Sequence, residues 1–274
     1  MSISMNTNVQ SLNAQRNLSM TQGRLSGNLG RLSTGQRINT ASDDSAGLAI
    51  SERFKAQIRS YAQAERNAND GISLTQTAEG AMNEVSGVLT RMRELAVQAS
   101  NGTVSAGDRG FINNEAQALS GEVDRISAVT EFNGTKLLDG TLSTSLQVGA
   151  KNTANDRIAI AIGSTTFATL AGAAVDLSTA AGAQSALTAL DTAIDAVSTQ
   201  RAGLGTIQNR LQVTISNLGS ARENTSAANS RIRDVDVASE TADMTRNNIL
   251  MQAGISVLAQ ANSAPQVALN LLRG

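Results

Sequence analysis

Apolar residues along this chain recur at alternating intervals of three and four residues, in several separate blocks. This spacing places the apolar side chains on one narrow stripe of a helix. The longest stripe consists of Leu187, Leu190, Ile194, Val197, Arg201, Leu204, Gln208, Leu211, Ile215 and Leu218. It predicts a coiled-coil seam, in which an occasional polar residue fixes the register of the helices.

A second block predicts one uninterrupted helix of unusual length. Its stripe is entirely apolar and consists of Leu74, Ala78, Ala81, Val85, Val88, Met92, Leu95 and Ala99. Asp43 or Asp44 offers an N-cap oxygen before the block, and Asn101-Gly102 offers a stop after it. Such a helix would reach about 85 Å at 1.5 Å per residue, so we expect a rod.

Three shorter stripes have the same spacing. One contains Ile112, Ala116, Leu119, Val123 and Ile126. The opening segment contains Leu18, Leu25, Leu29 and Leu32, and the last segment contains Met244, Met251, Ile255 and Leu258, with Asn248 and Asn262 as its polar members. Because every stripe must face another, we predict helices packed side by side.

The segment that follows the stripe ending at Ile126 has a different residue pattern. Asn133-Gly134 and Asp139-Gly140 are strong turn dipeptides, and Ile158, Ile160 and Ile162 alternate as in a half-buried strand. We predict a small β-hairpin region over about 133–163. Residues 164–185 are poor in charge and rich in Ala, Gly, Ser and Thr, which fits a surface insertion or short linker.

Composition agrees with a mainly α fold in which a long helical coiled-coil or bundle rod carries a small β-hairpin region. The 274 residues are 41% hydrophobic but include no Trp, one Tyr and four Phe. A compact domain of this length would bury about 75% of its unfolded surface, which needs bulky side chains. Slender packing of helices suits this composition better than a thick core.

Charge and residue types exclude several functions. The 22 basic and 23 acidic residues leave no net field for nucleic acid or an anionic membrane. Without His or Cys the chain has no Ser-His-Asp triad, thiolate nucleophile or common zinc site, so we expect no enzyme, cofactor or metal. The start lacks the features of a secretory signal peptide, and no stretch approaches the roughly 18 apolar residues of a membrane helix.

Five longer motifs resemble bacterial flagellin, the subunit of the flagellar filament. They are "LSTGQRINTASDDSAGLAISERFKAQIRS", "NDGISLTQTAEGAMNEV", "RMRELAVQASNGT", "EFNGTKLLDG" and "ILMQAGISVLAQANSAPQVALNLLR". The resemblance covers about residues 1–163 and 185–274. Only about 20 residues separate its two halves, where many flagellins carry large outer domains. The chain therefore resembles a minimal flagellin.

The resemblance implies a domain organisation. The N- and C-terminal helices, 1–42 and 235–274, would pair in an inner-tube domain. Residues 43–163 and 186–234 would form the helical rod, and 164–185 would be a short variable insertion. Assembly would depend on the stripes of the two terminal segments, which are Leu18, Leu25, Leu29, Leu32, Met244, Met251, Ile255 and Leu258.

The resemblance also implies function and partners. The chain would be secreted by a type III apparatus and polymerise with itself into the extracellular filament that drives swimming. Its other partners would be an export chaperone and the hook-junction and filament-cap proteins. A hook–filament junction protein of the same superfamily is the nearest alternative. A signalling coiled coil, such as a chemoreceptor hairpin, is the alternative from another class.

An outside partner implied by the resemblance is the flagellin-sensing Toll-like receptor of animal hosts. The motif that such receptors recognise matches Arg91, Leu95 and Gln98 on one helix and Glu115 on the next. A central arginine with an apolar neighbour is a common make-up of an interface hot spot. The alternative interpretation is that Leu95 belongs to the core and that Arg91 and Glu115 form a solvated face.

Overall fold

The computed structural model describes residues 7–172 and 175–273, with side chains described as far as residue 263. The chain divides into two compact units. The terminal unit comprises Met1–Ala56 and Asn224–Gly274, and the central unit comprises Gln57–Glu223. Two long helices, α2 (Ser45–Ser100) and α5 (Ala180–Arg233), contribute to both.

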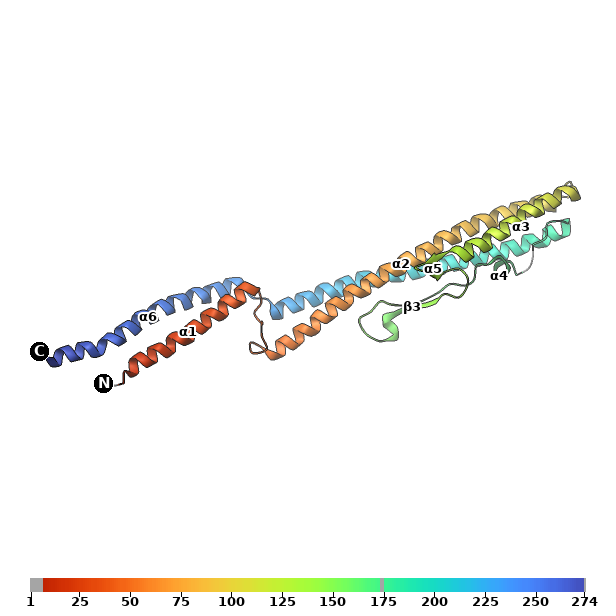
Figure 1. Cartoon of the computed structure of the whole chain (residues 1–274). Coiled ribbons are helices and arrows are strands. Elements are labelled where there is room, and N and C mark those ends of the chain that lie inside the picture. The colour runs from red at the N-terminus through yellow and green to blue at the C-terminus, as the bar shows by residue number, and fades with distance from the viewer. Residues whose placement is uncertain (1–6, 173–174, 274) are drawn as a thin grey trace. The chain divides into compact units, whose positions relative to one another are not determined.

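Helix α2 confirms the prediction of one uninterrupted helix. It begins one residue after Asp44, whose Oδ1 accepts a hydrogen bond from the Gly47 N–H at 2.8 Å. Of the two predicted N-cap candidates, Asp44 therefore caps the helix, whereas Asp43 Oδ2 accepts hydrogen bonds from the Asn39 and Thr40 N–H groups of the preceding connector. Helix α3 (Ala106–Val129) follows after a short turn and begins with Ser105 as its N-cap (Figure 1).

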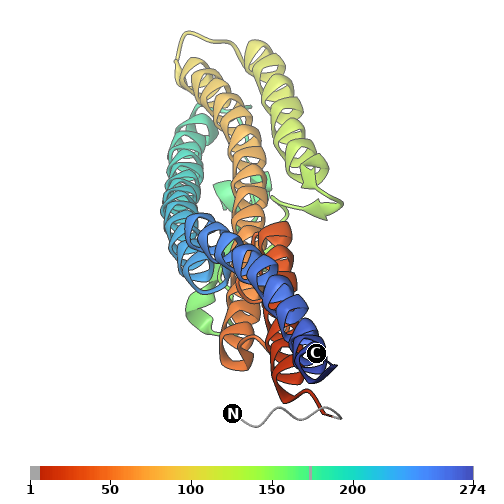
Figure 2. The ribbon, with the colours of Figure 1, turned by 90° about the vertical axis from the view of Figure 1, so that its left-hand side faces the viewer.

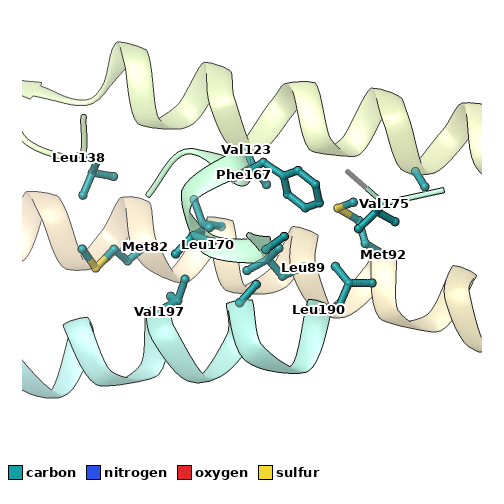
Figure 3. Packing of buried hydrophobic residues seen from close by; sticks show 14 of the residues in the cluster. Met82, Leu89, Met92, Val123, Leu138, Phe167, Leu170, Val175, Leu190 and Val197 are labelled. Carbon is teal, nitrogen blue, oxygen red and sulfur yellow. The ribbon is translucent and has the colours of Figure 1, made fainter. Parts of the chain in front are cut away.

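The core of the central unit lies where α2, α3 and α5 face one another (Figure 3). The stripes of α2 and α5 predicted from the sequence are buried or partly buried there, which confirms them. Helix α2 additionally buries Met82, Leu89 and Ala96, which lie next to its predicted stripe. A helix that packs against two neighbours needs a wider apolar surface than a two-stranded seam provides.

Two short antiparallel hairpins confirm the predicted β region. Strands β1 (Glu131–Phe132) and β2 (Thr135–Lys136) are joined by Asn133 and Gly134, which both have positive φ. Strands β3 (Ser143–Gln147) and β4 (Arg157–Ala161) flank the 3₁₀ helix η1 (Ala154–Asp156). The alternating isoleucines point inward as predicted, because Ile158, Ile160 and Ile162 are all buried.

The interpretation of residues 164–185 as a surface insertion or linker is wrong. The segment forms the short helix α4 (Phe167–Ala171) and the start of α5, and buries Phe167, Leu170 and Leu177 in the core. Helix α3 anchors it, since the Phe167 N–H donates to Asp124 Oδ1 at 2.7 Å. The prediction rested on the average composition of the segment, which is dominated by Ala, Gly, Ser and Thr. An average of this kind does not reveal the few large apolar side chains that pack in the core.

The terminal unit consists mainly of α1 (Val9–Thr34) and α6 (Val237–Arg273), which lie side by side (Figures 1 and 2). This pairing confirms the predicted fold class. The connectors after α1 and before α6 also pair: the Arg37 N–H donates to the Arg233 carbonyl at 2.7 Å, and the Val235 N–H to the Gly35 carbonyl at 3.1 Å. No helix among the described residues is long and apolar enough to cross a membrane.

Candidate assembly interface

The facing sides of α1 and α6 form an antiparallel seam with heptad spacing on both helices. Asn8 Nδ2 donates to the Ala261 carbonyl at 2.7 Å, and a Cβ at Gly254 would lie 3.3 Å from Leu18 Cδ1. The seam positions, all buried or half-buried, are Ser11, Ala14, Leu18, Thr21, Leu25, Asn28 and Leu32 on α1, and Glu240, Met244, Asn247, Met251, Gly254, Leu258 and Ala261 on α6.

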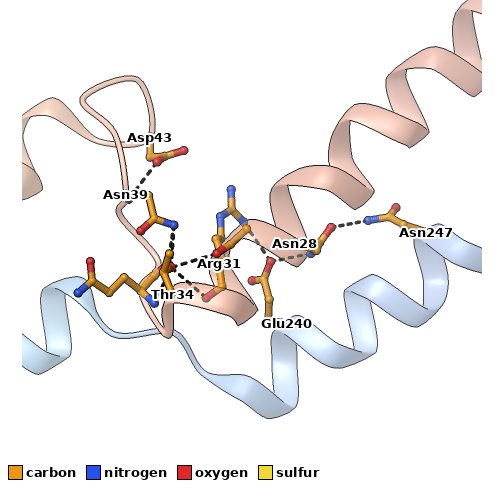
Figure 4. Close-up of polar contacts among 9 residues, drawn as sticks. Asn28, Arg31, Thr34, Asn39, Asp43, Glu240 and Asn247 are labelled. Carbon is orange, nitrogen blue, oxygen red and sulfur yellow. Dashed lines mark hydrogen bonds and ion pairs between the residues drawn. The ribbon is translucent and has the colours of Figure 1, made fainter.

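Three buried polar side chains interrupt this seam (Figure 4). Asn28 Nδ2 donates to Glu240 Oε1 at 2.6 Å, and Asn247 Nδ2 donates to Asn28 Oδ1 at 2.9 Å. The half-exposed Arg31 guanidinium lies 3.4 Å from the same Glu240 oxygen. These side chains therefore supply hydrogen-bond partners to one another. A buried carboxylate and buried amides need such partners, because burying them without hydrogen bonds is costly.

Six of the eight assembly residues predicted from the sequence belong to the seam, and two do not. Leu29 and Ile255 are each 53% exposed, and their neighbours Asn28 and Gly254 take the seam positions instead. The apolar pattern selected the bulkier residue at each place. Hydrogen bonds and the close approach of Leu18 to Gly254 decide the seam in the folded pair.

Large apolar side chains remain uncovered on the other sides of both terminal helices. We refer to the following residues as the exposed apolar set: Val9, Leu12, Met20 and Leu29 on α1, and Val237, Ile249, Leu250, Ile255 and Val257 on α6. Single exposed apolar residues are ordinary on a protein surface, whereas many on two neighbouring helices indicate an interaction surface.

An open groove of about 640 Å³ runs between α1 and α6 beside the polar cluster. Its α1 side includes Gly23 and Gly27, where an added Cβ would meet no atom within 4 Å. Met20 and Leu250 of the exposed apolar set line it, together with Arg24 and Arg246. Bare backbone flanked by apolar side chains can accept another helix at close range.

The residues assigned to receptor binding lie where α2 and α3 run side by side. Arg91 Nη2 lies 2.9 Å from Glu115 Oε1, and Arg91 Nη1 lies 3.1 Å from Glu94 Oε2. The Glu115 carboxylate, followed by that of Glu94, raises the pKa of the Arg91 guanidinium above its usual value. Arg91, Gln98 and Glu115 are all exposed, so they form one accessible polar surface.

Leu95, in contrast, does not belong to that surface. Only 2% of it is exposed, because it lies on the α2 stripe that packs in the core. Its assignment as a receptor contact is therefore corrected in favour of the core interpretation. The most exposed apolar residue near these positions is Phe111, which is 75% exposed and one helical turn before Glu115, whereas Val97, next to Gln98, is 49% exposed. Sequence reasoning missed Phe111, although it falls next to the stripe position Ile112.

The described residues hold no group of three or more acidic, His or Cys side chains arranged to bind a metal ion. The surfaces described above are of two kinds, namely uncovered apolar helix faces and exposed ion pairs. Both suit association with other proteins.

Comparison with known proteins identifies the family. A family model described as the bacterial flagellin N-terminal helical region matches residues 5–143, and one described as the bacterial flagellin C-terminal helical region matches residues 187–272. The chain belongs to the bacterial flagellin family. Flagellins are structural proteins, which confirms the expectation that the chain is not an enzyme.

Individual relatives agree over nearly the full length. The flagellin of Halalkalibacterium halodurans is 49% identical, with 98% of this chain and 99% of the relative covered. The flagellin of Bacillus subtilis is 45% identical, and the 33 kDa flagellar filament core protein of Treponema phagedenis is 42% identical, at the same coverage. These matches confirm a minimal flagellin and support a role as a filament subunit.

Two solved structures share the fold. The crystal structure of Bacillus cereus flagellin matches with a TM-score of 0.51 and 34% sequence identity. The match covers 60% of this chain and 94% of the Bacillus cereus chain. A putative flagellar hook-associated protein from Vibrio parahaemolyticus has a TM-score of 0.58 but only 13% identity, over 70% of this chain and all of its own, so it shows the fold alone.

Proposed function

We propose that this flagellin polymerises through its terminal helices, with the exposed apolar set of each copy covered by neighbouring copies in the extracellular filament. The observation that carries the proposal is the number of large apolar side chains that α1 and α6 leave uncovered after they have paired. Burying such surface is the main favourable term in protein association. Contacts of this kind that do not close on themselves generate an open helical polymer.

The groove beside the polar cluster supports the same proposal. Its glycines leave room for a neighbouring helix, and its apolar lining residues belong to the exposed apolar set. The predicted division into an inner-tube domain (1–42 and 235–274) and a rod (43–163 and 186–234) follows from this assignment. We keep it as part of the proposal.

A seeded growth assay tests the proposal. Purified chain is mixed with filament fragments, and growth is followed by light scattering and electron microscopy. Ile255→Glu should stop growth, because it places a charge in apolar surface that a neighbour covers. Gln252→Glu, at an exposed polar position about one turn earlier on α6, is the matched control. Equal growth of both variants, or no filaments from the natural chain, would contradict the proposal.

The filament subunit is favoured over the hook–filament junction alternative. The curated relatives at 42–49% identity carry flagellin or filament-core names, whereas the hook-associated likeness is far more distant. Nothing in the family result supports a signalling coiled coil. A filament subunit would also contact hook-junction proteins at the base and a cap protein at the tip.

Export through a type III apparatus is a further part of the proposal, with α6 held by a chaperone before assembly. Ile249, Leu250, Ile255 and Val257 supply the apolar side chains that a chaperone groove would cover. Calorimetry with a chain ending at Asp234 should give no heat of binding to the chaperone. Undiminished binding would place the chaperone site outside α6.

Recognition by the host Toll-like receptor is a second candidate function, and the exposed Arg91–Glu115 pair favours it. We propose that Arg91, Gln98 and Glu115 contact the receptor with Phe111, rather than Leu95, as the apolar anchor. Truncating Arg91 or Phe111 to Ala should each cost about 2 kcal/mol of receptor affinity, as expected of hot-spot residues.

Arg125→Ala is the matched control for the receptor assay. Arg125 is an exposed arginine of helix α3, which also carries Phe111, and it pairs with a glutamate at 2.6 Å. Receptor affinity would be measured by surface plasmon resonance on monomeric chain. If Arg91→Ala and Phe111→Ala bind as tightly as Arg125→Ala, the receptor site lies elsewhere.

A further inference from the structure

The apolar residues of the α1–α6 seam do not by themselves define which residues of the two helices face each other. Leucines recur every seven residues on α1, and Met244, Met251 and Leu258 recur every seven residues on α6. Sliding α6 by one heptad moves it about 10 Å along α1 and still sets large apolar side chains against one another. Seams of this kind need polar residues to select one register.

The polar cluster does not repeat in this way. Asn28 lies between Glu240 and Asn247, which are seven residues apart on α6, and it is hydrogen-bonded to both. After a slip of one heptad in either direction, Asn28 keeps one of these two neighbours and loses the other. In one direction Glu240 moves past the end of α1. In the other, Asn247 moves to Thr21, which lies seven residues before Asn28 and carries, in place of an amide, a hydroxyl that already donates to the Asn17 carbonyl at 2.9 Å. A buried polar group without a partner is costly, so the slipped pairings are disfavoured.

The cluster also distinguishes the two helices from each other. Helix α1 contains no acidic residue, so a pair of two α1 helices would offer no carboxylate to Arg31. A pair of two α6 helices would bury Glu240 without the amide of Asn28 and without that arginine. Only α1 with α6 satisfies all the members of the cluster.

The pairing of the connectors is a separate constraint. It joins Arg37 to Arg233 and Val235 to Gly35, which lie at the helix ends or beyond them. These bonds would break if α6 slid by one heptad, so they oppose a slip from the helix ends, but they do not determine which faces of the helices meet further along. Asn28 and Asn247 lie within the helices, and their hydrogen bond favours the contact of these two helix faces.

We infer that Asn28, Glu240 and Asn247 set the register and the partner choice of the α1–α6 pair. This goes beyond the proposed polymerisation, because it concerns pairing within one chain. A single register would give every copy the same outer surface for assembly. A slip of one heptad would instead shift Ile255 by about 10 Å relative to Leu29. Copies in different registers would present different surfaces to their neighbours.

The chain contains no cysteine, so disulfide trapping can read the register directly. Gly254→Cys is combined in turn with Leu18→Cys, which reports the observed register, and with Ser11→Cys or Leu25→Cys, which report a slip of one heptad. Each pair is oxidised in the full chain, both before and after seeded growth. The yield of intramolecular disulfide is measured by gel mobility and mass spectrometry.

With the natural cluster, the disulfide at position 18 should exceed those at 11 and 25 by about tenfold or more, since one buried polar group loses its partner in the slipped pairings. Asn28→Leu/Glu240→Leu/Asn247→Leu should lower this excess by about tenfold, and the connector bonds would maintain what remains of it. The control Asn17→Leu/Asn248→Leu/Gln252→Leu adds the same apolar groups outside the seam and should keep the preference for position 18.

The inference is overturned if the seam variant keeps the full excess of the disulfide at position 18, or if the natural cluster shows no preference. Helix content is measured by circular dichroism to test whether the seam variant is folded. Should it unfold, Glu240→Gln, which keeps the hydrogen bonding, and Glu240→Leu give the same comparison with a single change. Filament formation is scored separately by microscopy, so a chain that traps at position 18 but does not polymerise contradicts only the proposed function.

Discussion

The terminal and central units are built from the same kinds of helices but use their apolar residues in opposite ways. In the central unit the apolar stripes are buried or partly buried, mainly in one large cluster and a smaller second one around Leu211. In the terminal unit the buried apolar residues among those described are Ile38 and Ala261, whereas four buried residues are polar, namely Asn28, Ser51, Glu240 and Asn247. Most of the large exposed apolar side chains also belong to the terminal unit.

This contrast indicates that the two units depend on different sources of stability. The central unit hides enough apolar surface to offset the entropy of ordering its chain. The helix pair of the terminal unit hides little and leaves many large apolar side chains exposed, which the proposed assembly would cover. A pair that leaves many large apolar side chains on its outer faces gains stability when something covers those faces. We therefore expect the two units to respond differently to mutation, pH and assembly.

The largest expected effect is the loss of polymerisation. Deleting residues 257–274 removes Leu258 and Ala261 from the seam and Val257 from the exposed apolar set. The truncated chain should stay soluble, keep the unfolding transition of its central unit, and give no filaments by electron microscopy. Normal filament growth would show that the terminal pair is not needed for assembly.

The second largest effect separates the two units by their stability. Leu190→Ala removes a fully buried side chain of α5 and should lower the free energy of unfolding of the central unit by about 3 kcal/mol. Leu29→Ala, at an exposed position of α1, should change the stability of the free chain by no more than about 0.5 kcal/mol. Urea unfolding followed by circular dichroism measures both. Similar losses from the two variants would contradict the contrast.

The smallest effect concerns the connector after α1. Hydrogen bonds from the backbone N–H groups of Thr40 and Asn39 lower the pKa of the Asp43 carboxyl. A lowered folded pKa means that the carboxylate stabilises the connector above its unfolded pKa and stops doing so as pH falls through the folded value. Asp43→Asn should speed amide exchange of Thr40 at pH 7.

In acid, Asp43 of the natural chain is protonated in both the folded and the unfolded state. The Thr40 amide of Asp43→Asn should then exchange at the same rate as that of the natural chain. Asp156→Asn, a substitution in the central unit, is the control and should leave Thr40 unaffected at either pH. Exchange is followed by mass spectrometry with correction for the intrinsic rate. A difference at Thr40 that persists unchanged in acid would contradict the role of the Asp43 charge.

The sequence predicted the central unit well for a physical reason. The stripes of α2 and α5 meet within one chain, so apolar spacing and burial coincide at residues such as Val85 and Leu204. The hairpins were predictable because Asn133-Gly134 has few other conformations available in a tight turn.

Elsewhere burial depends on partners that a local pattern does not reveal. Asn28 is buried because Asn247 and Glu240 reach it from the other end of the chain, so polarity alone places it wrongly on the surface. Leu95 matched a receptor motif but packs in the core, whereas Phe111, next to a stripe position of α3, is exposed. For segment 164–185, average composition concealed Phe167 and Leu170.

Hydrogen exchange of the whole chain, measured on monomer and on filament, tests the central claim most directly. Amides of α2, α3 and α5 within the central unit should be protected in both states, because their core is complete in one chain. Amides of α1 and α6 should exchange rapidly in the monomer and become protected in the filament, where neighbours cover the exposed apolar set. Equal protection of α1 and α6 in both states would contradict the account.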